Sequence, residues 1–427
     1  MIPELRTCFN LQFAAHQYAS LLRLLEQRCG KPVEFRVAET PIFVTEKLLN
    51  ELAADGASLA RSIIANAGCL EAARSAIPAG YRVPHETAHP NFLTADFALI
   101  RDAAGTLVPR LVEIQAFPSV YGYQAELCSA YREAFHLDQV FPGQQLGQFL
   151  GGLNEDTYWQ LLARTIVAGH DPENVVLTEL DPLHQKTLPD FEVTGRRLGI
   201  AVVDIRDLVP SGNRLHYRHA DGRLVPIHRI YNRAIADELI AKRIQLPFDL
   251  EREWNVEWAG HPNWYFLISK FSIPWLSSPI VPPAVFLSDY LEDNGHSRLA
   301  AAGVPLPPTS DPDAVYNYLL LKPLFSFAGK GIEFDPSFKL LESIPPARRP
   351  DYLLQQRMSF EPTIDTPFGL TQAEIRILYA WPDGEALTPA LSLVRLGRGK
   401  MMGVDHNRDL RWVGASAAFF PTTPPPA

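Results

Sequence analysis

Two short apolar runs carry three oxygen-bearing side chains that are suited to bind a metal ion. Asp96 lies in the run 92–100, and Glu113 and Gln115 lie at the end of the run 107–114. A turn-rich connection joins the runs, so we expect a hairpin whose alternation places Glu113 and Gln115 on one face beside Asp96. Two carboxylates and an amide oxygen suit Mg²⁺ and leave positions open for phosphate and water. A surface hairpin with ordinary edge charges is the alternative.

A lysine interrupts an apolar run further along the chain. Lys322 lies in the expected strand 318–324, and Gly329, Lys330 and Gly331 follow it in a flexible turn. The backbone N–H groups of such a turn can bind phosphates, although neither a Walker A loop nor a G-x-G-x-x-G pattern is present. An isolated buried ammonium needs an anion, so we expect it to contact phosphate. A solvated turn, and a structural carboxylate as partner for the lysine, are the alternatives.

Two later strands add polar residues to the pattern. The strand 352–356 carries Gln355 and Gln356 and can present its backbone to an adenine ring, with a plain core strand as the alternative. Glu374 and Arg376 share one strand face, so a carboxylate and a guanidinium can act together on a metal-bound phosphate. The alternatives are that these two side chains pair with each other, or that Glu374 pairs with the buried lysine.

A zinc-binding pattern occurs near residue 85. His85, Glu86 and His89 form an H-E-x-x-H sequence, which on a helix would bind zinc through both histidines with the glutamate as base. Pro84 and Pro90 bracket these residues. Because proline disfavours helical angles in the residue before it, the required helix has no room to extend. A zinc metallohydrolase is therefore kept only as an alternative function.

The order of these pieces resembles the ATP-grasp superfamily. In most members the D…E-x-N-x-x-P segment closes the domain, whereas its counterpart here precedes the Lys-Pro strand. That order is similar to the circularly permuted ATP-grasp group, which includes the glutathionylspermidine synthetase family, over residues 90–420. The residues that carry the resemblance are Asp96, Glu113, Gln115, Pro118, Lys322, Gln355, Gln356, Glu374, Arg376, Arg395 and Asn407.

The resemblance implies ATP and Mg²⁺ as cofactors and suggests roles for individual residues. Asp96, Glu113 and Gln115 are the implied Mg²⁺ ligands. Arg376 and Arg395 are the implied catalytic cations. The implied nucleotide-binding residues are Lys270, Lys322, Gly329, Lys330, Gly331, Gln355 and Gln356.

Two positions depart from the pattern of the family. Gln115 replaces the usual Asn, which keeps the amide oxygen but adds one methylene group. Thr94 stands where relatives often carry Arg, two residues before the aspartate. We expect Arg376 or Arg395 to supply the missing cation.

Residues 154–243 show a β-α-β rhythm that predicts a small parallel α/β unit. This unit resembles the substrate domain that precedes the ATP-grasp core in such ligases. Within it, the segments 178–181, 184–187 and 229–233 lie at strand ends, where open α/β sheets bind ligands. A structural role is the alternative for each substrate candidate. The candidate substrate residues are Arg229, Asn232, Arg233 and Asn407.

Pattern and resemblance together predict an α/β (α+β) protein with a circularly permuted ATP-grasp fold, an embedded small parallel α/β substrate domain and a helical N-terminal region. Helical spacing runs from Leu11 to Cys29 and again from Thr45 towards Ala65. The expected divisions are a helical region 1–85, a hairpin segment 86–150 that completes the metal site, a pre-ATP-grasp-like domain 151–245, an ATP-grasp core and lid 246–420, and a frayed tail 421–427.

Composition excludes several classes of partner. Apolar residues make up 47% of the chain and charged residues 20%, as in ordinary globular proteins. The net charge of −9 argues against binding to nucleic acid or to an anionic membrane. The apolar stretch 264–287 contains Lys270 and several prolines, so we expect no membrane span. With no visible secretory signal and no C-x-x-C spacing, we expect a cytoplasmic protein with buried free thiols.

The predicted function is an ATP-dependent ligase that joins a carboxylate to an amine or a thiol through an acyl phosphate and releases ADP and phosphate. Its expected partners are a small-molecule or peptide carboxylate and an amine, and the sequence indicates no oligomeric state. A non-catalytic ATP-binding or regulatory module and the zinc metallohydrolase are the alternatives.

Overall fold

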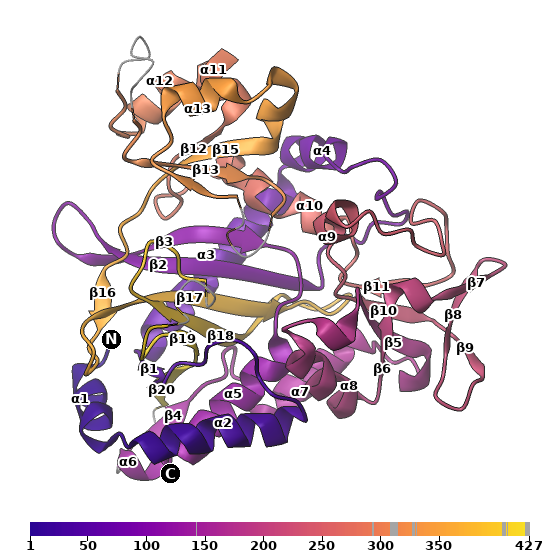
Figure 1. The fold of residues 1–427 in the computed structure, drawn as a ribbon, viewed down its shortest axis with the longest axis horizontal. Helices are drawn as coiled ribbons and strands as arrows, with labels where there is room; N and C mark the ends of the chain where they lie inside the picture. The colour runs from indigo at the N-terminus through magenta and orange to yellow at the C-terminus, as the bar shows by residue number, and fades with distance from the viewer. Residues whose placement is uncertain are drawn as a thin grey trace.

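The computed structural model describes residues 1–141, 143–292, 294–307, 315–326, 329, 331–403, 407 and 409–422. An antiparallel sheet at its centre combines a hairpin from early in the chain with strands from near its end (Figure 1). The strands of this central sheet are β2 (Phe92–Arg101), β3 (Leu107–Gln115), β16 (Pro362–Ile364), β17 (Thr371–Ala380), β18 (Thr388–Gly397) and β19 (Gly414–Ser416). Their order is β19-β18-β17-β2-β3, and β16 also pairs with β17.

The hairpin predicted from the sequence is confirmed as β2 and β3. Its two faces differ because side chains alternate along a strand. Ala95 and Phe97 of β2 pack with Ile375 and Ile377 of β17 in the apolar core. The other face carries Asp96 together with Glu113 and Gln115, which lie opposite Asp96 and Thr94 on β3. The central sheet therefore has one apolar face and one charged face.

A second antiparallel sheet forms the upper lobe in Figure 1. Its strands occur in the order β12-β15-β13-β14, and short helices cover it. These elements are β12 (Ala284–Phe286), β13 (Leu319–Pro323), β14 (Glu333–Phe334), β15 (Tyr352–Gln356), α11 (Leu287–Glu292), α12 (Gly295–Ala301), α13 (Phe338–Ser343) and η5 (Pro346–Asp351). A separate apolar cluster that includes Val285, Leu319 and Leu354 holds this lobe together.

The predicted β-α-β unit is confirmed as a parallel sheet of order β11-β10-β5-β6. A three-stranded antiparallel arm projects from it on the right of Figure 1. The strands of the parallel sheet are β5 (Val175–Glu179), β6 (Ala201–Asp204), β10 (Arg229–Asn232) and β11 (Glu257–Ala259). Its helices are α7 (Glu155–Ile166), α8 (Leu188–Leu198), α9 (Ala236–Ala241), η1 (Pro172–Asn174), η2 (Pro182–His184) and η3 (Ile205–Asp207). The arm comprises β7 (Val209–Ser211), β8 (Arg214–Arg218) and β9 (Leu224–Pro226).

The helices of the first part of the chain lie beside the central sheet, together with a small peripheral sheet of order β1-β20-β4. The continuous helix expected over 11–29 is wrong, because the backbone is extended at Phe13 and Ala14. Phe13 stacks there on Phe135 and contacts Trp412, so tertiary packing overrides the local helical pattern. The helices of this first part are α1 (Pro3–Gln12), α2 (Ala15–Cys29), α3 (Glu46–Ala65), α4 (Ala67–Ser75), α5 (Tyr121–Ala134) and α6 (Leu137–Val140). The peripheral sheet comprises β1 (Ile42–Phe43), β4 (Gln145–Gly147) and β20 (Ala418–Thr422). Two short helices come from later in the chain, α10 (Trp264–Leu267) and η4 (Lys270–Trp275).

The chain end and the membrane prediction can also be compared with the structure. Pro421 and Thr422 belong to β20, which corrects the expectation that the tail frays from residue 421, and 423–427 lie outside the described residues. Among the helices of the described residues, none is both long and apolar enough to cross a bilayer.

Helix α3 lies against the apolar face of the central sheet through a glycine. The side chain of Thr45 caps its first turn by accepting a hydrogen bond from the backbone of Leu48. At Gly56, an added Cβ would lie 2.9 Å from the Cβ of Ala95 and would overlap the hydroxyl of Tyr379. The absence of a side chain therefore allows the helix to approach the sheet.

We expect Gly56→Ala to lower the free energy of unfolding by about 1–3 kcal/mol, because overpacking outweighs the higher helix propensity of alanine. Denaturant-induced unfolding measures this change. Gly68→Ala in α4 is the matched control, because the nearest atom to its added Cβ lies 3.5 Å away. Equal stability of the two variants would contradict the packing argument.

Candidate functional site

Four neighbouring strands bring charged residues together on one face of the central sheet. Asp96 of β2 lies opposite Glu113 of β3 and opposite Arg376 of β17. On the other side of β17, Glu374 lies opposite Arg395 of β18. The register between β2 and β3 shifts directly after Asp96, and such bulges are common beside functional sites. Residues that are distant in sequence thus form one charged cluster.

Both arginines of this cluster bind Asp96. The Arg376 guanidinium donates from Nε to Asp96 Oδ1 at 2.5 Å and from Nη2 to Oδ2 at 2.6 Å. Its third nitrogen, Nη1, donates to Ser119 Oγ at 3.3 Å. Arg395 pairs with Glu374, and its Nη1 lies 3.5 Å from Asp96 Oδ2. In this arrangement both oxygens of Asp96 accept hydrogen bonds from guanidinium groups.

Two lysines approach the cluster from other elements. Lys270 is the first residue of η4, and its Nζ lies 3.1 Å from Glu113 Oε1 and donates to the backbone oxygen of Ser326. Lys322 projects from β13 of the upper lobe, and its Nζ donates to Gln355 Oε1 at 2.6 Å. The hydrogen-bond partner of Lys322 is thus an amide and not a carboxylate such as that of Glu374, which was the alternative to the expected phosphate contact.

The electrostatics of the cluster shift several pKa values. Burial raises the pKa of Glu113, but Lys270, Lys322 and Arg376 outweigh it and hold the pKa below its usual range. Burial lowers the pKa of Lys322 to about 8, although the nearby carboxylates oppose that effect. For Glu374, burial raises the pKa, and Arg395 only partly offsets this. The ammonium of Lys322 is therefore costly to keep charged without a further anion.

A cavity of about 1010 Å³ brings most of the predicted site residues together. It extends from the charged face of the central sheet to the carboxyl edge of the parallel sheet. Glu374 also lines it, as do Arg398 and Lys400 from the segment after β18. The predicted site residues that line the cavity are Asp96, Glu113, Gln115, Arg233, Lys270, Lys322, Gly329, Gln355, Gln356, Arg376 and Arg395.

Two expectations about the nucleotide-binding segments are modified. β15 lies between β12 and β13, and the backbone N–H groups of Gln356 and Arg357 bond the carbonyl oxygens of Pro283 and Tyr318. These N–H groups are consequently not available to an adenine ring, so Gln355 and Gln356 contribute to the cavity through their side chains. Lys330 lies outside the described residues.

Three other predicted residues do not line this cavity. Gly331 has a positive φ of 75° and packs against Pro323. Asn232 is buried within β10. Asn407 donates to the backbone oxygens of Met401 and Gly403 at 3.1 and 3.2 Å. Asn407 therefore holds the segment that carries cavity-lining residues, and its predicted substrate contact remains untested.

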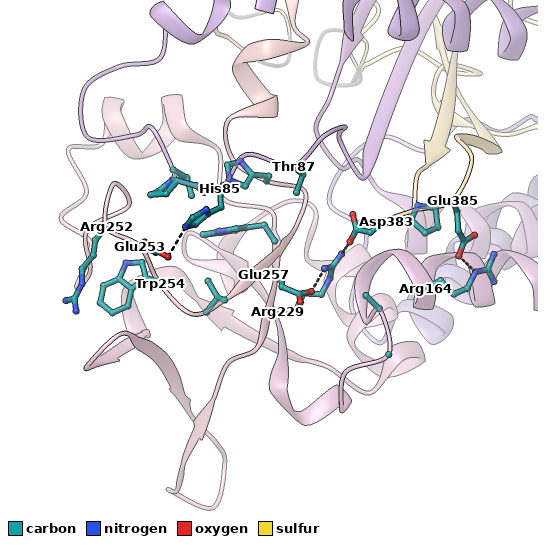
Figure 2. Close-up of a pocket in the computed structure, with 18 residues that line it drawn as sticks. His85, Thr87, Arg164, Arg229, Arg252, Glu253, Trp254, Glu257, Asp383 and Glu385 are labelled. Carbon is teal, nitrogen blue, oxygen red and sulfur yellow. Dashed lines mark hydrogen bonds and ion pairs between the residues drawn. The ribbon is translucent and has the colours of Figure 1, made fainter. Parts of the chain in front are cut away.

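Arg229 begins β10, whereas Arg233 follows the end of that strand. Arg229 lines a different cavity, of about 630 Å³ (Figure 2). Its guanidinium is 2% exposed and pairs with Glu257 at 2.7 Å and with Asp383 at 2.9 Å. It also donates to backbone oxygens at the end of α7. Arg229 thus joins three parts of the fold and does not belong to the charged cluster.

His85 of the H-E-x-x-H sequence borders this second cavity, but the geometry of the motif does not suit a zinc site. Residues 85–89 are not helical, and His85 has a positive φ of 57°. Glu86 pairs with Arg74 at 2.7 Å, and the ring of His89 stacks on Trp381. Within the described part of the chain, no group of three or more His, Cys, Asp or Glu side chains is arranged to hold a metal ion. The helix that the zinc alternative requires is therefore missing.

Glu179 was not among the predicted site residues, although it ends β5 at the edge where ligands were expected. Its side chain lines the large cavity, and its Oε1 accepts a hydrogen bond from the backbone N–H of Leu180. Burial raises the pKa of Glu179 to about 8. Nearby, Arg233 pairs with Asp190, which also accepts from the backbone of Tyr123 at the start of α5. The sequence signal that could have identified Glu179 is an acidic residue at the end of a buried apolar strand.

Comparisons with known proteins support the fold. No protein-family profile matches the chain, and no curated protein matches it in sequence. A glutathione synthetase-like effector from Globodera pallida, solved in its apo form, is similar in structure, with a TM-score of 0.53 and 12% identity. The match covers 94% of this chain and 96% of that one.

The chain has a glutathione synthetase-like fold. The predicted α+β class is confirmed, and the predicted ATP-grasp resemblance holds at the level of a related fold. The likeness shows the arrangement of the elements alone, because the identity between the two sequences is low.

Glu179 generates a prediction on pH dependence. Its pKa is about 8 in the folded protein, against an ordinary value of 4.5. Between these values the folded state binds more protons than the unfolded state, so stability falls as the pH rises through this window. We expect Glu179→Gln to flatten this dependence and to be more stable than the wild type at pH 8. Thermal unfolding from pH 5 to 9 measures the pH dependence of stability. The exposed residue Glu342, changed to Gln, is the control. Parallel curves for Glu179→Gln and wild type would rule the explanation out.

Proposed function

We propose that this protein is an ATP-dependent ligase that joins a carboxylate to an amine or a thiol through an acyl phosphate. The observation that carries the proposal is the convergence of four cations on one large cavity within a glutathione synthetase-like fold. The four cations are Lys270, Lys322, Arg376 and Arg395. Phosphoryl transfer depends mainly on positioning and on neutralising phosphate charge, which this set of residues is suited to provide.

The phosphate-binding role follows from the cost of the buried charges. Lys322 is 5% exposed and donates to a neutral amide, and burial lowers its pKa. Lys270 lies close enough to Lys322 for the two ammonium groups to repel each other. A triphosphate between them would supply the missing negative charge. We therefore assign both lysines to the nucleotide phosphates.

The residues on the charged face fit Mg²⁺. Asp96, Glu113 and Gln115 offer only oxygen ligands, which is the chemistry that this ion prefers. Glu113 Oε1 is buried and makes an ion pair with the Lys270 ammonium at 3.1 Å. It accepts no hydrogen bond of good geometry from the described residues. Asp96 Oδ1 retains a second lone pair beside its bond from Arg376, whereas Oδ2 accepts from both arginines. When bound, the ion would neutralise and orient the phosphates.

The second half of the cavity is suited to the substrates. It contains Glu179, Gln185 and Arg233 from the carboxyl edge of the parallel sheet. In the proposed reaction, a substrate carboxylate oxygen attacks the γ-phosphorus and ADP leaves. The nitrogen of an amine then loses a proton and attacks the acyl carbon, and phosphate leaves. Arg376, which also bonds Ser119, stands where it can orient the attacking carboxylate.

The assay for this proposal is Mg²⁺-dependent release of ADP with pools of amino acids, short peptides and amines. We expect Glu113→Ala to abolish turnover, because losing a carboxylate leaves the charges of metal and Lys270 uncompensated. Gln115→Asn should keep partial activity, since the amide oxygen survives. Glu361→Ala is the matched control, because Glu361 pairs with Arg101 outside the cavity. Tight ATP binding without turnover on any pool would favour the non-catalytic ATP-binding module instead.

Lys322 allows the nucleotide site to be tested without any substrate. We expect Lys322→Met to melt at or above the wild-type temperature, because it removes a costly buried charge and keeps the apolar stem. The variant should lose the stabilisation that Mg-ATP gives to the wild type. Exposed Lys339→Met serves as the control in the same thermal unfolding assay. A variant that melts well below wild type yet gains the full ATP shift would make Lys322 a structural residue.

A further inference from the structure

Asp96, one of the two carboxylates expected to hold Mg²⁺, is already bound by two arginines of the same chain. Arg376 occupies both oxygens of Asp96, and Arg395 bridges Asp96 and Glu374. Arg376 is 9% exposed, and its planar fork matches the carboxylate in a bidentate pair. A divalent cation that approaches Asp96 therefore meets a fixed positive charge beside its ligand.

We propose that Arg376 and Arg395 act as internal counter-cations, which occupy the metal-binding carboxylate of Asp96 until a nucleotide phosphate takes over their N–H groups. Metal and nucleotide would then bind cooperatively, each weakly alone. This inference rests on the proposed function and concerns the regulation of that same site.

The reason is the cost of a displaced buried guanidinium. If Mg²⁺ alone drew Asp96 away from Arg376, the buried arginine would keep a single bond, to the neutral hydroxyl of Ser119. Removing one partner of a buried ion pair is strongly destabilising, because it leaves a charge uncompensated. A phosphate removes this cost, because it accepts bidentate hydrogen bonds from the guanidinium as a carboxylate does.

The strand register keeps the exchange local. Arg376 lies directly opposite Asp96 across β17 and β2, and Arg395 lies directly opposite Glu374 across β18 and β17. All of these side chains line the cavity in which we place the phosphates. Rotation of the arginine side chains from carboxylate to phosphate thus requires no change in strand pairing. By thermodynamic linkage, nucleotide must raise metal affinity by the same factor by which metal raises nucleotide affinity.

Binding of Mn²⁺, measured through the electron paramagnetic resonance of the free ion, tests the proposal without turnover. For the wild type we expect weak binding of Mn²⁺ alone and an affinity roughly 5–150-fold higher with a non-hydrolysable ATP analogue. We expect Arg376→Gln to bind Mn²⁺ alone at least about tenfold more tightly than wild type, within that same range, since Asp96 is released. Adding Asp96→Asn to Arg376→Gln should remove this gain. Arg101→Gln, which breaks an ion pair outside the cavity, should leave Mn²⁺ binding unchanged.

The two proposals fail in different ways. Equal Mn²⁺ affinity of wild type and folded Arg376→Gln would overturn the counter-cation role, whatever the nucleotide does. A wild type that binds no nucleotide at all would overturn the proposed function and with it the coupling. If Arg376→Gln does not fold, Arg395→Gln is the second variant. A smaller increase in Mn²⁺ affinity is then expected, because Asp96 loses one of its two cations while Arg376 keeps its place, and an unchanged affinity would overturn the role.

Discussion

The antiparallel pairing of β2 with β17 places Asp96 opposite Arg376, although the two residues are 280 positions apart in sequence. The charged face of the central sheet depends on this register. A slip of β2 by one residue would turn Asp96 towards the core and would expose its apolar neighbour Phe97 to the cavity. The cost of burying unpaired charges, together with the apolar core on the other face, therefore fixes the alignment of the hairpin against the late strands.

The cavity is charged on several sides because three separate sheets contribute residues to its lining. The upper lobe contributes Lys322 from a strand that is otherwise apolar, and the parallel sheet contributes Glu179 and Arg233 at its carboxyl edge. These three residues come from two sheets that do not pair with the central one. A single element that carried all of these residues would bury like charges next to one another. Because the charged residues come from several elements around the cavity, a ligand bound in the cavity can complete their charge balance.

Local features of this fold were predictable from the sequence. The hairpin, the helix that begins at Thr45 and the strand 352–356 depend on neighbours only a few residues away, and the structure has them at or close to the predicted positions. Alternation within a strand also placed Glu113 and Gln115 on one face. For the zinc pattern, the flanking prolines correctly argued against a helix.

Long-range features were not predictable in the same way. Nothing in the sequence distinguishes Arg229 from Arg233, yet the four-residue strand β10 separates them into two different cavities. The pairing of Arg376 with Asp96 depends on strand order, which local patterns do not reveal. The break at Phe13 depends on aromatic partners from elsewhere in the chain, such as Phe135.

The four cations of the cluster are not interchangeable, and their placement follows their chemistry. The arginines stand on the central sheet, where the planar fork of Arg376 can match the carboxylate opposite it and its charge persists at any ordinary pH. The lysines approach from β13 and η4, where the compact ammonium of Lys322 bonds Gln355 and that of Lys270 lies beside Glu113. Burial lowers the pKa of Lys322, and its neighbour Lys270 lowers it further. The two arginines are therefore neutralised by Asp96 and Glu374 on the same sheet, whereas the two lysines are short of negative charge. An anionic ligand would be drawn first to the lysines and would reach the arginines only by competing with Asp96 and Glu374.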